Sequence, residues 1–85
     1  MKVYIHLKIN DSGIKTDKGC MQQFQTLAAA KEALREIQRA ARRQNYPACF
    51  PSTSCEFLRV ADPHPMGKWY FWEYTIRRLT PKKQK

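Results

Sequence analysis

Residues 2–9 alternate apolar and polar side chains, which predicts a strand with period two. Its inward-pointing positions are Val3, Ile5, Leu7 and Ile9, and its outward-pointing positions are Lys2, Tyr4, His6 and Lys8. The following sequence, Asn10-Asp11-Ser12-Gly13, is typical of a turn, because Asn and Asp bond their own backbone and Gly accepts a positive φ. Residues 20–25 predict a second strand, with Phe24 as its core contact. We expect a hairpin whose loop is longer than two residues.

A helical pattern follows, with apolar residues at spacings of three and four. These residues are Leu27, Ala30, Leu34, Ile37 and Ala41, with Ala33 and Ala40 widening the stripe. Thr26 is expected to cap the helix, because its hydroxyl can accept a hydrogen bond from a free backbone N–H in the first turn. The sequence Asn45-Tyr46-Pro47 stops the pattern, so the expected helix runs from residue 27 to about residue 44.

The most aromatic stretch, residues 68–78, predicts the last strand. One of its faces carries Tyr70, Trp72, Tyr74 and Ile76, and the other carries Trp69, Phe71, Glu73, Thr75 and Arg77. Between this strand and the helix, residues 47–54 predict a loop and residues 55–61 predict a third strand. Pro63 and Pro65 are expected to block its continuation.

This order of elements predicts an α+β fold: a four-stranded antiparallel sheet in the order ββαββ, with one long helix packed on one face. The expected core consists of Val3, Ile5, Leu7, Ile9, Leu27, Leu34, Ile37, Tyr70, Trp72 and Tyr74. The opposite sheet face is expected to be open and to present Tyr4, His6, Trp69 and Phe71 beside Lys2, Lys8 and Arg77. Large aromatic side chains on an open face indicate either a binding surface or a place where the protein self-associates.

Length and charge limit the class of protein. A chain of 85 residues fits one domain, expected over residues 1–80 with a basic tail at 81–85. Its formal charge of +9 favours an anionic partner, although a solubilising surface without a partner is the alternative. The N-terminal alternation fits neither a signal peptide nor a membrane span, and three cysteines suit a reducing compartment. We therefore expect a cytoplasmic protein that does not bind membranes.

Besides its apolar stripe, the predicted helix carries a pattern of charged residues. Four arginines share the face opposite the apolar stripe: Arg35, Arg39, Arg42 and Arg43. They form either a solvated face that complements the helix dipole or a binding stripe. The candidate partner-binding or nucleic-acid-binding residues are therefore Arg35, Arg39, Arg42, Arg43, Tyr4, His6, Lys8, Lys68, Trp69, Phe71, Arg77 and Arg78.

The sequence contains no specific catalytic or metal-binding signature. Cys20, Cys49 and Cys55 lack the paired spacing of structural zinc ligands, and we expect them to be small, mostly buried hydrophobic residues. Neither histidine is placed by a local motif beside a nucleophile, and a glycine-rich phosphate loop is absent. We expect no enzymatic activity, no cofactor and no metal.

Two classes of binding protein remain. Aromatic residues interleaved with cations suit a single strand of RNA or DNA, because bases stack on the rings and cations follow the backbone. The glycines of the RNA-recognition strand motif are missing, and one helix is too few for that fold or for a helix-turn-helix. Trp, Tyr and Arg also dominate protein–protein hot spots, which favours an inhibitor or adaptor.

The layout of two strands, a helix and two strands, together with the run Phe24-x-Thr26-Leu27-x-x-Ala30-Lys31, resembles small phage and mobile-element proteins of the anti-CRISPR type. The resemblance implies a non-enzymatic protein that blocks an effector complex by steric occlusion. Many anti-CRISPR proteins are acidic DNA mimics, whereas this chain is basic. The resemblance therefore implies contact with guide RNA or with acidic patches on a protein. We expect an inhibitor of a nucleic-acid-containing host machine, whose partner is a host ribonucleoprotein or protein complex. Monomer and homodimer are both open alternatives for its own assembly. The alternative is a stand-alone RNA-binding or single-stranded-DNA-binding module.

Overall fold

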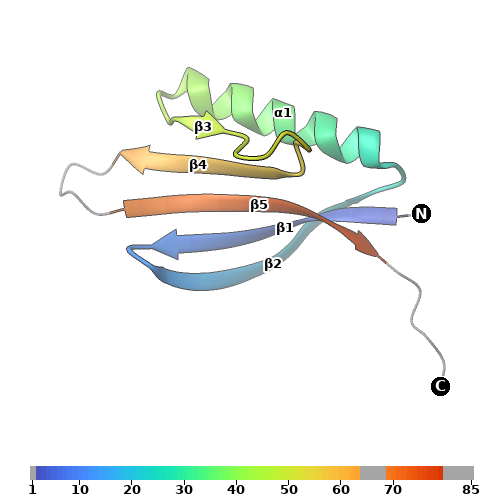
Figure 1. Cartoon of the computed structure of the whole chain (residues 1–85), viewed down its shortest axis with the longest axis horizontal. Helices are drawn as coiled ribbons and strands as arrows, with labels where there is room; N and C mark the ends of the chain where they lie inside the picture. Colours follow the sequence, from blue (N-terminus) through green and yellow to red (C-terminus); the bar gives the residue numbers. More distant parts are fainter. Residues whose placement is uncertain (1, 64–68, 80–85) are drawn as a thin grey trace.

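The computed structural model describes residues 2–63 and 69–79. The elements are β1 (Lys2–Asp11), β2 (Ile14–Phe24), α1 (Leu27–Arg43), β3 (Ala48–Cys49), β4 (Phe57–Pro63) and β5 (Trp69–Leu79) (Figure 1). Within these residues, the predicted α+β fold with one helix and an antiparallel sheet is confirmed. The sheet has five strands, however, and the predicted number of four was wrong. The additional strand is β3, which lies in the segment expected to be a loop.

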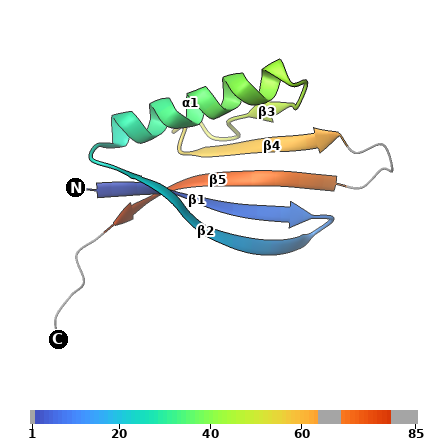
Figure 2. The same ribbon diagram turned by 180° about the vertical axis from the view of Figure 1, so that it is seen from behind.

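The strands lie in the order β2-β1-β5-β4-β3, and all neighbouring pairs are antiparallel. The first and last strands are therefore neighbours inside the sheet (Figure 2). Their register pairs Ile5 with Ile76, Leu7 with Tyr74, and Ile9 with Trp72. Because directly opposed residues share a sheet face, the aromatic strand has the two faces that its alternation predicted.

The first hairpin is tighter and longer than predicted. Its turn consists of Ser12 and Gly13, both with positive φ (54° and 94°), as a type I′ turn requires. The Gly13 backbone N–H donates to Asn10 Oδ1 at 2.9 Å, which fixes the turn. The segment between Gly13 and Cys20 was expected to lie outside the strands, but β2 begins at Ile14. An edge strand that is exposed almost throughout has no apolar alternation for the sequence to reveal.

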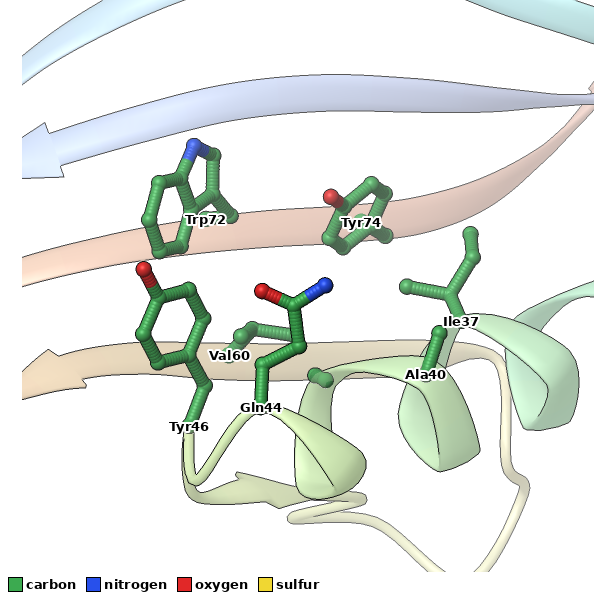
Figure 3. Close-up of a pocket in the computed structure, with 8 residues that line it drawn as sticks. Ile37, Ala40, Gln44, Tyr46, Val60, Trp72 and Tyr74 are labelled. Atoms are coloured by element: carbon green, nitrogen blue, oxygen red, sulfur yellow. The ribbon is translucent and has the colours of Figure 1, made fainter.

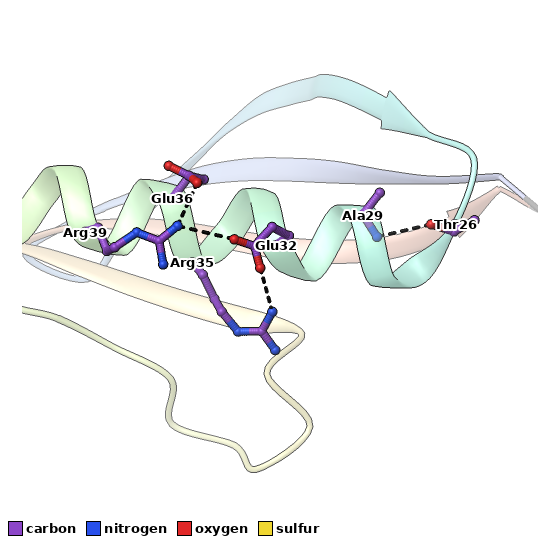
Figure 4. A network of polar contacts seen from close by, with 6 residues as sticks. All are labelled: Thr26, Ala29, Glu32, Arg35, Glu36 and Arg39. Atoms are coloured by element: carbon purple, nitrogen blue, oxygen red, sulfur yellow. Dashed lines mark hydrogen bonds and ion pairs between the residues drawn. The ribbon is translucent and has the colours of Figure 1, made fainter.

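The helix begins and ends close to where the sequence predicted. The Ala29 backbone N–H donates to Thr26 Oγ1 at 3.1 Å, which confirms the N-cap (Figure 4). At the other end, Gln44 is the C-cap residue and Asn45 takes a positive φ of 66°, which turns the chain away from the helix axis.

The strand β3 lies at the sheet edge and pairs with β4 through Ala48 opposite Val60 and Cys49 opposite Arg59. Side chains of the helix cover this edge, since Gln38 and Arg42 both donate to the Ala48 carbonyl, at 3.1 and 3.0 Å. The neighbouring strand β4 starts and ends two residues later than predicted. Pro63 does not stop it, because a proline at the last position of a strand removes no hydrogen bond that the ladder needs.

The core lies between α1 and the sheet, and β1, β3, β4 and β5 all contribute buried residues to it. Its buried members are Val3, Ile5, Ala30, Leu34, Ala48, Leu58, Val60 and Ile76, and partly buried residues packed against them include Phe24, Leu27, Ile37, Trp72 and Tyr74. Leu7, Ile9 and Tyr70 were expected in the core, but they are half-buried and lie outside this cluster. The reason is the position of the helix, which runs along β3 and β4 and leaves the far part of the β1–β2 hairpin uncovered (Figures 1 and 2).

Candidate nucleic-acid interface

The sheet face opposite the helix is covered by no other element among the described residues (Figures 1 and 2). The register of the strands places a mixture of aromatic and charged side chains on it. They are Lys2, Tyr4, His6 and Lys8 from β1, Phe71, Glu73 and Arg77 from β5, Phe57 and Arg59 from β4, and Lys15 and Asp17 from β2. We call this surface the open face.

Arg59 is the centre of one half of the open face. Its guanidinium carbon lies 5.6 Å from the ring centroid of Phe57 and 5.2 Å from that of Phe71, so it interacts with both rings. Its Nη2 is 3.7 Å from Glu73 Oε2, and Lys15 Nζ is 3.6 Å from Glu73 Oε1. Glu73 is only 5% exposed because these long side chains cover it. Glu73 therefore offsets one of the two positive charges in this half, and the two phenylalanine rings are partly covered by Arg59.

His6 and Asp17 form a second cluster, between β1 and the edge strand β2. His6 Nε2–H donates to Asp17 Oδ1 at 2.5 Å, and the Gly19 backbone N–H donates to the same oxygen at 2.7 Å. These hydrogen bonds hold the pKa of Asp17 below its usual value, with the bond from His6 as the larger cause. His6 is opposite Cys20 in the register, and together with Tyr4 and Gln23 they line a hollow of about 210 Å³.

The remaining end of the open face combines an aromatic ring with cations. Tyr4 is opposite Arg77 in the register, and Lys2 lies two positions before Tyr4 on the same strand face. Lys2 and Arg77 are both exposed, and neither forms an ion pair with another residue of the described ranges. Tyr4, Arg77 and Lys2 are therefore the part of the open face best able to bind an anion and to stack against a planar group. We call these three residues the Tyr4 end.

Most of the helix arginines are already engaged by other groups. Arg35 donates to Glu32 at 3.1 Å, and Arg39 donates to Glu32 and Glu36 at 3.2 and 2.6 Å (Figure 4). The bonds from Arg39 and Arg35 hold the pKa of Glu32 below its usual value. Arg42 contacts the Ala48 carbonyl, as described above. The geometry therefore fits the interpretation of a charged face that stabilises the helix, and Arg43 is the member without an ion pair among the described residues.

The predicted binding residues include four at the ends of the aromatic strand: Lys68, Trp69, Arg77 and Arg78. The structure separates two of them, since Arg77 lies on the open face and Arg78 lies on the helix side, where it donates to Glu56 at 3.2 Å. Trp69 is placed by its backbone pairing with Pro63. Lys68 lies outside the described residues.

Four members of the open face were not predicted from the sequence: Phe57, Arg59, Lys15 and Asp17. Phe57 was assigned to the apolar bulk of the third strand together with Leu58 and Val60. The alternation of Leu58 and Val60, which are both buried, is the signal that would have put Phe57 and Arg59 on the opposite face.

No group of three or more His, Cys, Asp or Glu residues in residues 2–63 and 69–79 is arranged to hold a metal ion. The cysteines are free thiols, as expected, but Cys20 and Cys49 are exposed and Cys55 is half-buried, so the prediction that they are mostly buried was wrong. The helix α1 is too short and too polar to cross a membrane.

Family models, curated proteins and solved structures were all compared with the chain, and none of them matches it significantly.

Proposed function

We propose that this protein is a non-enzymatic binding module for single-stranded nucleic acid, which it contacts through the open face of its sheet. The observation that carries the proposal is the Tyr4 end, where an aromatic ring lies between two exposed cations on a face that no described element covers. Aromatic rings stack bases of any sequence, and adjacent cations follow the phosphate backbone. This combination suits a flexible single strand better than a duplex, whose bases are already stacked.

The rest of the open face supports the proposal in a different way. Arg59 lies close to the rings of Phe57 and Phe71 and forms an ion pair with Glu73, so its guanidinium group is restrained without a ligand. A preorganised arginine plane offers a second stacking position for a base, at a smaller entropic cost than a free side chain. Both cations of this half, Arg59 and Lys15, are already paired with Glu73, so we expect this half to contribute mainly stacking and the Tyr4 end to contribute most of the electrostatic part of the affinity.

The matched pair Arg77 and Arg78 tests the proposal. The binding of fluorescein-labelled oligouridine and oligothymidine of about ten nucleotides would be measured by fluorescence anisotropy over a range of salt concentrations. Two phosphate contacts, from Lys2 and Arg77, predict a slope of log K against log salt of about −1.4. Arg77→Gln should halve this slope, whereas Arg78→Gln, a change at the next residue on the opposite face, should leave it unchanged.

Tyr4→Leu provides the stacking test, because it keeps an apolar side chain on the strand and removes the ring. The affinity should fall by about 1–3 kcal/mol, the usual contribution of a stacked base, without loss of the thermal unfolding transition. Absence of oligonucleotide binding at low salt would refute the proposal. So would an equal effect of Arg77→Gln and Arg78→Gln, since only one of these side chains lies on the open face.

A second candidate function is inhibition of a host ribonucleoprotein by occlusion. It is favoured by the groove and half-buried aromatic residues on the helix side of the sheet, which a strand on the open face would not contact. Affinity capture from a bacterial lysate, with and without nuclease, separates the two functions. Capture of a defined ribonucleoprotein that persists after nuclease treatment supports the inhibitor, and capture that nuclease abolishes supports the direct binder.

A further inference from the structure

On the helix side of the sheet, the part of the β1–β2 hairpin away from the helix is covered by no other described element (Figures 1 and 2). Leu7 and Ile9 of β1 are half-buried there, opposite Tyr74 and Trp72 of β5, and Ile14 of β2 is 73% exposed. This apolar surface is continuous in the register with the groove between β5 and the last turns of α1. It lies on the face opposite Tyr4 and Arg77, so it can be occupied independently of a nucleic acid on the open face.

The groove has the size and the lining for one long side chain. Its volume is about 310 Å³, at the lower limit of small-molecule pockets. Ile37 and Ala40 of the helix form one wall, and Trp72 and Tyr74 of β5 form the other (Figure 3). The Gln44 side chain points into the space between the walls, so a ligand also meets a polar group (Figure 3).

Three aromatic rings meet at the mouth of this groove. Tyr46 stacks on Trp72 with ring centroids 5.7 Å apart and an angle of 19° between the planes. Tyr70 meets Trp72 edge-on, with centroids 5.1 Å apart and an angle of 71°. The ring faces of this cluster that are not covered by another ring carry the negative potential that attracts a cation.

The charges around these rings have the opposite sign to the net charge of the protein. The register places Tyr70 between Asp11 of β1 and Asp62 of β4, on the same sheet face. The ion pairs among the described residues involve neither of these two carboxylates. Lys8, Arg59 and Arg77 all point to the open face, and Arg78 lies at the far end of β5 beside Glu56. The surface around Tyr70 is therefore aromatic and acidic, whereas the basic residues of the last helical turn, Arg42 and Arg43, are neighbours in sequence of the groove residues Ala41 and Gln44.

We infer that this surface, formed by Tyr46, Tyr70 and Trp72 with Asp11 and Asp62, binds an arginine-bearing segment of a partner protein. An arginine side chain has an apolar stem that fits the groove, a planar cation that interacts with aromatic rings, and donors for carboxylates. Nucleic acid is disfavoured here, because the two carboxylates repel phosphates. A second copy of this chain is disfavoured by the repulsion between two chains of charge +9.

Peptide binding tests the inference on the intact protein. The probe is a fluorescein-labelled peptide of alternating glycine and arginine, and its control is the same peptide with citrulline, which keeps the shape of arginine and removes the charge. We expect the citrulline peptide to bind about tenfold more weakly or not at all. Equal binding of the two peptides, or no binding of either, would overturn the inference.

Variants locate the site and separate it from the open face. Asp11→Asn combined with Asp62→Asn should weaken arginine-peptide binding about tenfold and leave the affinity for oligouridine unchanged or slightly higher. Asp17→Asn removes a carboxylate from the open face and should not change peptide binding. Tyr70→Leu tests the aromatic part without truncating a core residue, and should weaken the arginine peptide more than the citrulline peptide. Unchanged peptide binding in the double variant would overturn the inference.

Sedimentation of the protein alone tests the competing occupant. A concentration-dependent dimer that Asp11→Asn with Asp62→Asn dissociates would assign the surface to a second copy and overturn the inference. A monomer over the same concentration range supports it. The arginine-peptide result does not depend on whether oligonucleotides bind, so this inference and the proposed function can fail separately.

Discussion

Two leucine substitutions test where the hydrophobic core ends. Leu34 is fully buried, with 0% of its surface exposed, between α1 and the sheet, whereas Leu7 is half-buried on the part of β1 that the helix does not cover. Leu34→Ala should destabilise the protein by about 3–4 kcal/mol, because it removes a fully packed side chain and leaves a cavity. Leu7→Ala should cost only about 1 kcal/mol, since half of the removed surface already faces water.

The difference between the two variants should be measurable because a small domain has a low free energy of unfolding. A chain of 85 residues is expected to be stable by about 4–13 kcal/mol, so the Leu34→Ala variant loses between about a quarter and nearly all of this free energy of unfolding. Urea unfolding followed by circular dichroism should separate the midpoints of the two variants by about 2 M, given a slope of about 1 kcal/mol per M. Ile14→Ala, in the exposed part of the same hairpin, is the control and should leave the midpoint unchanged.

A loss of stability for Leu7→Ala equal to that for Leu34→Ala would refute this account of the core. It would mean that the β1–β2 surface is covered in solution. Repeating the measurement at several protein concentrations would identify the cover, because a midpoint that rises with concentration indicates self-association.

Three further predictions concern local features. Thr26→Ala should lower the stability by about 1 kcal/mol by removing the helix N-cap, and Thr26→Ser should restore it in urea unfolding. Gly13→Ala should destabilise the hairpin by about 1 kcal/mol, because alanine resists the φ of 94° at this turn, and Gly13→Asn should cost less in the same assay. Hydrogen bonds lower the pKa of Asp17 from its ordinary value of 3.8, and they lower the pKa values of Glu32 and Glu56 from 4.5. The stability that these carboxylates provide is therefore present above about pH 5, and it is lost as the pH falls through their folded-state pKa values. Glu56→Gln should flatten part of this acid-induced loss in thermal unfolding, and an unchanged acid limb would contradict the assignment.

The two sheet faces separate charges that the sequence presents side by side. Arg77 and Arg78 are neighbours in the chain, yet one is exposed beside Tyr4 and the other is paired with Glu56 on the helix side. The helix arginines, which looked like a second binding stripe, mostly satisfy Glu32, Glu36 and the Ala48 carbonyl. The net charge of +9 is therefore distributed unevenly over the molecule. One sheet face has a cationic end without ion pairs among the described residues, and the other has an aromatic surface with two aspartates.

The sequence by itself determined the helix and the strands whose boundaries and faces depend on residues close together in the chain. Thr26 and the stripe through Leu34 placed the helix within about a residue of its ends, since capping and helical periodicity act within a few residues along the chain. Alternation assigned the two faces of β1 and β5 correctly for the same reason. It could not place β2, because an exposed edge strand has no buried face, and it missed β3, because two residues carry no period.

Only the tertiary structure decided which of the inward-facing residues are buried. Leu7, Ile9 and Tyr70 have the same pattern as Val3, Ile5 and Ile76, but burial depends on where the helix lies on the sheet, and the helix follows β3 and β4. The structure likewise decided that Arg59 is held between Phe57 and Phe71 and that Tyr70 lies between two aspartates. These groupings depend on strand order and register, which join residues far apart in the chain and leave no signal in the local sequence.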